Sequence, residues 1–260
     1  DTQFAAVGCG ARPGEAVLSS GTWEILMLRH NQFAPNRLAF DEGLIYECDA
    51  EPGLWNPQLL MMGSGVLEWL RDLLYSDLAG RDDAYDVMIA DAQRYSPGDG
   101  GLTFLPSFVP STGPTKKHGT RGTSLGLELS TDRGKLYRAA LEGLSLQLRH
   151  ALEVLQQATG FVPKGVRAVG GGSKNQLWNQ IRADVTGLPV TITEQKEATV
   201  LGAAMFAFVG AGVYASAAEA QDGMTLGEQV IEPSDNQAVY EPVYKSYRMA
   251  PPALQGFYGK

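Results

Sequence analysis

Three consecutive glycines mark the part of the sequence best suited to binding a ligand. Gly170, Gly171 and Gly172 follow a short apolar run and precede a segment with helical spacing. Because glycine has no side chain, a ligand can approach the backbone there, and the first amides of the next helix are unpaired donors with partial positive charge. Ser173 is suited to capping that helix, and the Asn175 amide to contacting a base or a sugar. A tight strand-to-helix turn without a ligand explains the same glycines, so both interpretations stay open.

Two other short segments carry groups suited to phosphate chemistry. The turn SSGTW (19–23) lies between two apolar runs, and its hydroxyls and amides are able to hold a phosphate. A plain polar turn would have the same composition. Asp1 precedes an apolar run and is a candidate general base for a hydroxyl, although a carboxylate beside a helix start is often only a cap. The three histidines show no metal-ligand spacing (His30, His118, His150).

The composition excludes several classes of protein. With 260 residues, 44% of them hydrophobic and 19% charged, the chain is typical of globular proteins and long enough for one large domain or two small ones. A net charge of −8 argues against a nucleic-acid binder, but backbone amides can still bind a nucleotide. No apolar run approaches membrane-spanning length. Two cysteines are too few for a disulfide framework, so Cys9 and Cys48 are predicted to be reduced thiols in a cytoplasmic protein.

The elements that must position these groups change in character along the chain. Residues 1–60 are predicted to be rich in strands, with a hairpin over 16–28 and another strand within 43–50. Apolar residues at helical spacing then predict helices over 64–78 and 83–95.

The middle of the chain combines a long loop with a long helix. Residues 96–131 hold many Gly, Pro, Ser and Thr residues, and a loop of that length is typically functional or covers another part of the protein. Leucines at helical spacing predict a helix over 130–160, capped by Ser130 or Thr131 and ended by Gly160.

The last third of the chain alternates strands and helices, which predicts a parallel α/β layer with right-handed crossovers. The alternating segments are 165–170, 175–187, 189–193 and 198–212. An amphipathic segment closes the chain, with tyrosines spaced four and three residues apart (Tyr240, Tyr244, Tyr247).

Read in chain order, these segments resemble the C-terminal domain of the FGGY carbohydrate kinases over nearly all of residues 1–250. The segments that carry the resemblance are Asp-Thr-Gln, SSGTW, GSGVLEWLRD, GLTFLP, TRGTSLGL, YRAALEGL, VGGGSKNQLWNQIRADVTGLPV and ATVLGAAMFA. Within the family, SSGTWEILM and GGGSKNQLWNQI are most similar to the kinases of L-fuculose. The kinases of L-rhamnulose, which share the SSGTW turn, come next.

The resemblance implies an α/β fold of the actin-like, or ribonuclease-H-like, ATPase type. Residues 1–260 would form the C-terminal, nucleotide-binding lobe of a two-lobed kinase whose N-terminal lobe is absent from this chain. The implied reaction is transfer of a phosphoryl group from ATP, with Mg²⁺, to a ketose, and L-fuculose would give L-fuculose 1-phosphate. Since most sugar contacts would lie in the other lobe, this chain alone is expected to be inactive. The expected partners are the ketose, ATP and the N-terminal lobe, without nucleic acid or membrane, and a homodimer is allowed.

The resemblance also assigns roles to single residues at the phosphate end of the site. Asp1 matches the catalytic base, which in these kinases lies where the second lobe begins. Thr22 matches the threonine that approaches the terminal phosphates.

At the adenosine end, Gly171 and Asn175 match a glycine and an asparagine that contact the nucleoside, with Gly170 and Gly172 beside them. Glu68 falls near a position where relatives often use glutamine to reach ATP. This departure from the family pattern leaves the role of Glu68 open.

Two alternatives remain open from the sequence. The chain could serve a kinase of another ketose, such as L-rhamnulose, xylulose or ribulose, because the residues that would discriminate these sugars lie mainly outside it. It could also be a non-catalytic actin-like module that binds a sugar or a nucleotide, since a fold alone does not define a function.

Overall fold

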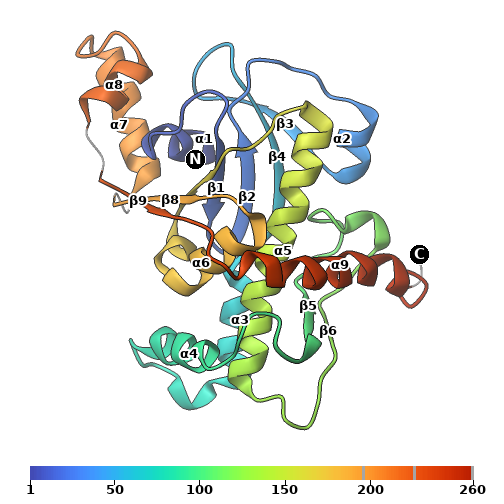
Figure 1. Ribbon diagram of the computed structural model, residues 1–260. Helices are drawn as coiled ribbons and strands as arrows, with labels where there is room; N and C mark the ends of the chain where they lie inside the picture. The colour runs from blue at the N-terminus through green and yellow to red at the C-terminus, as the bar shows by residue number, and fades with distance from the viewer. Residues whose placement is uncertain (195–196, 225–226, 259–260) are drawn as a thin grey trace.

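A computed structural model describes residues 1–194, 197–224 and 227–258 of the chain (Figure 1). Its helices are α1 (Thr2–Gly8), α2 (Arg37–Glu42), α3 (Ser64–Leu74), α4 (Ala84–Gln93), α5 (Arg133–Thr159), α6 (Gln176–Thr186), α7 (Ala198–Gly210), α8 (Ala217–Gly223) and α9 (Gln237–Leu254). Its strands are β1 (Ala16–Ser20), β2 (Trp23–Leu28), β3 (Ile45–Cys48), β4 (Trp55–Met62), β5 (Thr103–Leu105), β6 (Thr123–Leu125), β7 (Val166–Val169), β8 (Val190–Thr193) and β9 (Glu228–Ile231). A short 3₁₀ turn, η4 (Gly171–Lys174), follows β7.

A mixed seven-stranded sheet organises the molecule, in the order β3-β4-β2-β1-β7-β8-β9. Strands β1, β7 and β8 are parallel, and the remaining pairs are antiparallel. The predicted hairpin over 16–28 and the parallel layer in the last third of the chain are both confirmed. Strand β4 was missed by the sequence analysis, because Asn56, Pro57 and Gln58 interrupt its apolar pattern.

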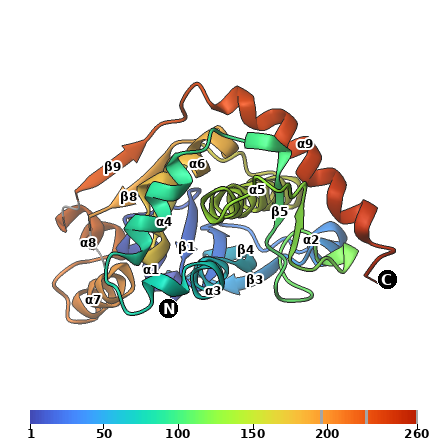
Figure 2. The ribbon, with the colours of Figure 1, turned by 90° about the horizontal axis from the view of Figure 1, so that it is seen from below.

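Helices cover both faces of the sheet (Figure 2). Alternate residues of a strand point to opposite faces of a sheet. In β1, Leu18 packs with Leu26 of β2 and with leucines of α5 such as Leu148. Val17, its neighbour, packs on the other face in a cluster that contains Ala5 of α1 and Ala198 of α7. The sheet is therefore the middle layer of an α/β sandwich.

The long helix α5 connects most of the other elements. Its N-cap is Asp132, whose side chain accepts a hydrogen bond from the Lys135 amide at 2.9 Å, so the prediction of Ser130 or Thr131 as the cap is wrong. The left-handed Gly160 ends the helix as predicted.

The tyrosine-bearing segment near the end of the chain docks on α5 as helix α9. Tyr240 is completely buried, accepts a hydrogen bond from Arg138 at 3.0 Å and donates one to Glu142 at 3.1 Å. The spaced tyrosines are thus the inner face of α9.

Helices α1 and α7 cross at a distance that only small residues allow. A Cβ atom at Gly202 would lie 1.9 Å from the Phe4 carbonyl oxygen, and one at Gly8 would lie 1.9 Å from the Ala198 carbonyl oxygen. Phe4 and Phe206 add an edge-to-face ring contact at 5.5 Å beside the crossing. The ATVLGAAMFA segment therefore positions α1, and with it Asp1, through backbone contact.

This crossing yields a first prediction. Gly202→Ala should lower the free energy of unfolding by about 1 to 3 kcal/mol, since the added methyl group meets backbone that cannot rotate away. Gly210→Ala on the same helix is the matched control, because a Cβ there meets nothing within 4 Å, and it should change stability by less than about 1 kcal/mol. Thermal denaturation of both variants tests this, and equal melting temperatures would contradict the close crossing.

Candidate functional site

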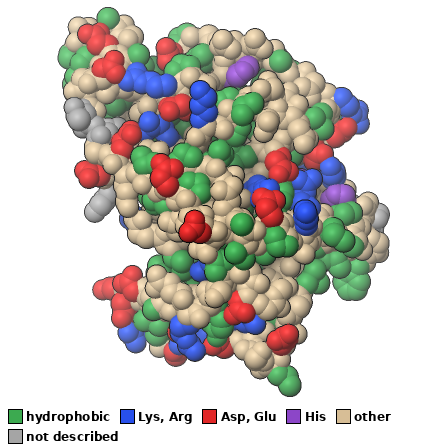
Figure 3. Space-filling view, viewed as in Figure 1, with side chains coloured by type: hydrophobic (Ala, Val, Ile, Leu, Met, Phe, Trp, Pro, Cys, Tyr) green, Lys and Arg blue, Asp and Glu red, His purple; other side chains and the backbone are tan. Residues whose placement is uncertain are grey.

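A cavity of about 390 Å³ lies between α3, α4, α5 and the glycine turn, which comprises residues 170–174. Its size falls in the range of small-molecule sites, about 300 to 1,000 Å³. The space-filling view shows a notch in the surface between the part of the molecule that carries α6 and the part that carries α4 (Figure 3). The lining residues are Ser64, Leu67, Glu68, Tyr85, Asp86, Ile89, Tyr137, Gly171, Gly172, Lys174, Asn175 and Trp178.

Four residues selected from the sequence meet in this cavity, namely Glu68, Gly171, Gly172 and Asn175. They come from α3, from η4 and from the start of α6, about a hundred residues apart in the chain. Gly170 lines a neighbouring cavity on the other side of the turn. The structure therefore brings Glu68, whose role the sequence left open, to the same cavity as Gly171 and Asn175, while Thr22 does not line it.

Packing requires a glycine at two of the three positions in this turn. Gly170 has a φ of 90°, and a Cβ there would lie 2.6 Å from the Ser20 carbonyl oxygen. A Cβ at Gly172 would lie 2.1 Å from the Ser20 hydroxyl oxygen. Gly171 has neither constraint, because a Cβ there meets nothing within 4 Å. Packing accounts for Gly170 and Gly172, whereas only the space in front of Gly171 is left for a ligand.

Asn175 is the N-cap of α6. Its side-chain oxygen accepts a hydrogen bond from the Trp178 amide at 3.0 Å, so the donor it can offer a ligand is its side-chain NH₂ group. Ser173, which the sequence analysis predicted as the cap of this helix, instead donates to the Gly170 carbonyl at 2.7 Å and stabilises the turn, so that prediction is wrong. Both polar residues thus hold the glycine turn in shape at the start of the helix.

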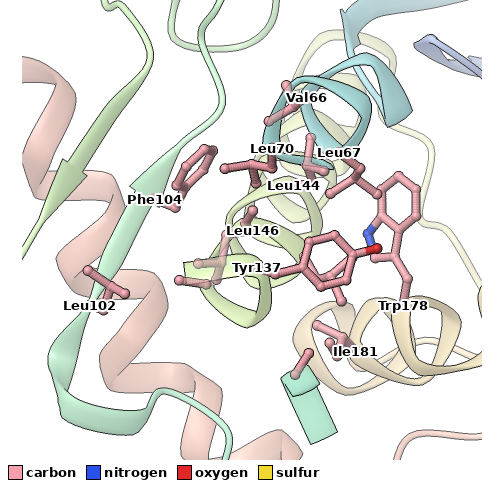
Figure 4. Packing of buried hydrophobic residues seen from close by; sticks show 14 of the residues in the cluster. Val66, Leu67, Leu70, Leu102, Phe104, Tyr137, Leu144, Leu146, Trp178 and Ile181 are labelled. Carbon is pink, nitrogen blue, oxygen red and sulfur yellow. The ribbon is translucent and has the colours of Figure 1, made fainter. Parts of the chain in front are cut away.

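Aromatic and aliphatic side chains form the floor of the cavity (Figure 4). Tyr137 of α5 and Trp178 of α6 are completely buried and point toward each other beside Leu67 of α3. Burial raises the pKa of Tyr137 well above its ordinary value, so the hydroxyl stays protonated. These residues were missed as site residues, because their spacing in the sequence indicates only the buried face of a helix.

The hairpin turn that carries Thr22 sits at the rim of this cavity. On one side, the amides of Gly63 and Ser64 donate to the carbonyls of Thr22 and Gly21 at 3.1 and 2.8 Å, which ties the turn to the start of α3. On the other side, Ser20 packs against the glycine turn. The Thr22 side chain is exposed and does not line the cavity.

Asp1 stands apart from the cavity at the start of α1. Its side chain is exposed and makes no capping hydrogen bond to the first turn of the helix. The capping interpretation of this aspartate therefore has no hydrogen bond to support it.

Metal and membrane features were also assessed over the part of the chain that the structure describes. There, no group of three or more His, Cys, Asp or Glu side chains is arranged to hold a metal ion. No helix within the same ranges combines the length and the apolar character needed to span a bilayer.

Comparison with known proteins now assigns the chain to a family. The model of the FGGY family of carbohydrate kinases, C-terminal domain, matches residues 16–211, and the chain belongs to this family. The L-fuculokinase of Haemophilus influenzae is 41% identical over 235 residues, which cover 90% of this chain and 48% of that protein. A glycerol kinase of Listeria innocua is 32% identical over 199 residues, which cover 76% of this chain and 38% of that protein. The chain spans about half the length of the curated relatives it matches.

A solved structure agrees with the family assignment. The crystal structure of xylulose kinase from Rhodospirillum rubrum matches with a TM-score of 0.86 at 28% identity, over 100% of this chain and 51% of that chain. The predicted α/β, actin-like ATPase fold is confirmed, and it is the fold of the C-terminal lobes of such sugar kinases.

The open space at Gly171 yields a second prediction. Gly171→Val should fold normally, because a Cβ there meets nothing within 4 Å, yet it should weaken ADP binding at least about tenfold, or about 1.4 kcal/mol. Isothermal titration with ADP and thermal denaturation measure the two effects separately. Gly172→Ala is the contrasting variant and should lower the melting temperature. Wild-type ADP affinity in Gly171→Val would remove this turn from the nucleotide site.

Proposed function

We propose that this chain is the C-terminal lobe of a two-lobed kinase that transfers the terminal phosphoryl group of ATP to a ketose, and that the ketose is L-fuculose. The observation that carries the proposal is the cavity in which Gly171, Asn175 and Glu68 meet beside the turn of Thr22. The identity of 41% to an L-fuculokinase supports the choice of sugar.

The adenosine part of ATP occupies this cavity, between the backbone at Gly171 and the wall of α3 that carries Glu68. The aromatic floor excludes water from the base, and the side-chain NH₂ group of Asn175 donates to the nucleoside. The phosphates extend toward the rim, where the exposed hydroxyl and the backbone amide of Thr22 meet the terminal phosphates. Gly170 and Gly172 keep the turn close enough to Ser20 for both contacts to form on one ligand.

The transfer itself requires a base for the sugar hydroxyl. Asp1 accepts the proton of the ketose C1 hydroxyl while the oxygen of that hydroxyl attacks the terminal phosphorus of ATP. The attack is in line with the bond that breaks to release ADP. An exposed carboxylate that makes no cap is available to a sugar held by a second lobe. Closure of the two lobes would exclude water and align the two substrates.

Mg²⁺ would enter this site bound to the phosphates of the nucleotide. The described residues hold no metal-binding cluster, whereas Mg²⁺ usually keeps several waters and binds through substrate phosphates with one or two carboxylates. When bound to ATP, it neutralises charge on the phosphates. No side chain of this chain is assigned to it.

Other parts of the sequence-based expectation stay predictions. They are the boundaries of the lobe, the cytoplasmic location, the homodimer and the ligand contacts of every predicted site residue, namely Asp1, Thr22, Glu68, Gly170, Gly171, Gly172 and Asn175. Because the chain is also similar to a glycerol kinase, another ketose or a small polyol is the alternative substrate.

A substrate panel tests the proposal as a whole. The two-lobed protein that carries this chain should consume ATP with L-fuculose at a kcat/KM at least about tenfold above that for L-rhamnulose, xylulose, ribulose or glycerol. Residues 1–260 alone, as the control, should bind ADP weakly and phosphorylate no sugar. Preference for another ketose would replace the substrate, and absence of turnover with every sugar would favour a non-catalytic module.

A single substitution tests the proposed base. Asp1→Asn in the two-lobed protein should lower kcat by about 10² to 10⁴, the usual contribution of base catalysis, while the constants for ATP and ketose change only a few-fold. The melting temperature should not change, since the Asp1 side chain makes no capping hydrogen bond. Asp82→Asn, another exposed carboxylate, is the control and should keep wild-type turnover. Wild-type turnover in Asp1→Asn would remove Asp1 from the mechanism.

A further inference from the structure

A completely buried ion pair lies directly behind the glycine turn. Glu24 of β2 and Arg182 of α6 form it, and both side chains are 0% exposed. Neither residue lines the candidate cavity. The pair joins the hairpin that carries Thr22 to the helix that begins at Asn175.

The guanidinium group of Arg182 is held on three sides. One terminal nitrogen, Nη2, donates to Glu24 and, at 2.6 Å, to the hydroxyl of Ser20, which itself donates to Glu24 at 2.9 Å. The other, Nη1, donates to Asn179 Oδ1 at 2.9 Å. The group also stacks 3.7 Å from the ring of Trp178, in the floor of the cavity.

The network continues into the glycine turn. Asn179 donates from Nδ2 to the Ser173 carbonyl at 2.7 Å, inside the turn. The Ser20 hydroxyl that Arg182 contacts is the same group that a Cβ at Gly172 would strike. The position of Arg182 therefore determines how the turn lies against the end of β1.

The same network reaches the opposite wall of the cavity. A Cβ at Gly63, just before α3, would lie 2.7 Å from Cγ of Glu24. Ser64, the next residue, lines the cavity and is tied to the hairpin turn through the Gly21 carbonyl. Glu24 thus contacts Ser20 of the phosphate turn (SSGTW, residues 19–23) and lies against the start of α3. Arg182 contacts Ser20 directly and reaches the glycine turn through Asn179.

Stability alone gives little reason for this arrangement. A buried ion pair can often be replaced by apolar side chains without loss of stability, because desolvation offsets the attraction between the charges. Two buried atoms add to the free-energy cost of desolvation, because Glu24 Oε2 and Arg182 Nε have no hydrogen-bond partner among the described residues. The pair instead fixes the relative positions of the groups that it contacts, because the hydrogen-bond donors of a planar guanidinium group point in fixed directions.

We propose that Glu24 and Arg182 are positioning residues that fix the position of the glycine turn relative to the phosphate turn, so that one nucleotide can contact both. The inference rests on the proposed kinase function. It extends that function, because neither residue touches the substrate. Loss of the pair would misplace Gly171 relative to Thr22 and weaken nucleotide binding, while ketose binding in the other lobe would remain.

A second buried ion pair offers a matched control. Arg29 and Asp49 are 1% and 0% exposed and are joined by two hydrogen bonds of 2.9 Å. Their other partners are Ala11, Glu51 and Asn56, none of which lines the candidate cavity. This pair shares the burial and the chemistry of the first pair but contacts neither turn.

The experiment replaces each pair by apolar side chains in the two-lobed protein. Glu24→Met/Arg182→Met leaves no unpaired buried charge, so a folded variant is expected. It should raise the Kd for ADP and the KM for ATP at least about tenfold while the KM for the ketose stays within about threefold. Arg29→Met/Asp49→Leu should leave all three constants within about threefold, even where its melting temperature falls.

The outcomes separate the two hypotheses. A folded Glu24→Met/Arg182→Met variant with wild-type nucleotide constants would overturn the positioning role. If that variant does not fold, Asn179→Ala keeps the Glu24–Arg182 pair but removes the side chain that links Arg182 to Ser173. It should still raise the Kd for ADP, and an unchanged Kd would overturn the proposal. A wild-type protein that binds no nucleotide would overturn the proposed function itself, and the inference with it.

Discussion

The contact between the end of β1 and the glycine turn is the constraint on which the candidate site depends. Parallel pairing of β1 with β7 sets Ser19 opposite Val169, which brings Ser20 beside Gly170. The backbone of the turn then lies so close to Ser20 that no side chain fits at Gly170 or Gly172. Every proposed contact to a nucleotide depends on this close approach, because it sets the separation between the candidate cavity and the SSGTW turn.

Close backbone approach recurs elsewhere in the fold. Gly8 and Gly202 allow α1 to cross α7, and Gly63 allows α3 to start directly against the β1–β2 hairpin. In each case the missing side chain lets an element with a candidate functional group approach the backbone of a neighbouring element. Since interiors are close-packed, such contacts leave little freedom for small adjustments. The positions of Asp1, Thr22 and the α3 wall are thus determined by packing between backbones.

Buried polar side chains also fix the positions of helices α9 and α6. Arg138 and Glu142 of α5 hold α9 through Tyr240, and Arg182 and Glu24 connect α6 with the hairpin. Each of these groups lies in the interior and depends on its partners, because an unpaired buried charge is costly. Together they hold α9 and α6 in place beside the candidate cavity, whose floor is aromatic.

The sequence by itself determined the elements and the segments that form the candidate site. Local periodicity was enough for the β1–β2 hairpin, α3, α5 and the alternating elements after β7, and glycine composition was enough to select residues 170–172. The sequence analysis missed strand β4 and the Asp132 cap. A strand interrupted by proline and the choice of a cap residue both depend on contacts with neighbouring segments. Only the tertiary structure decided which glycine faces open space, that Tyr137 and Trp178 form the floor, and that Glu24 meets Arg182. These facts depend on contacts between residues far apart in the chain, and no local pattern carries that information.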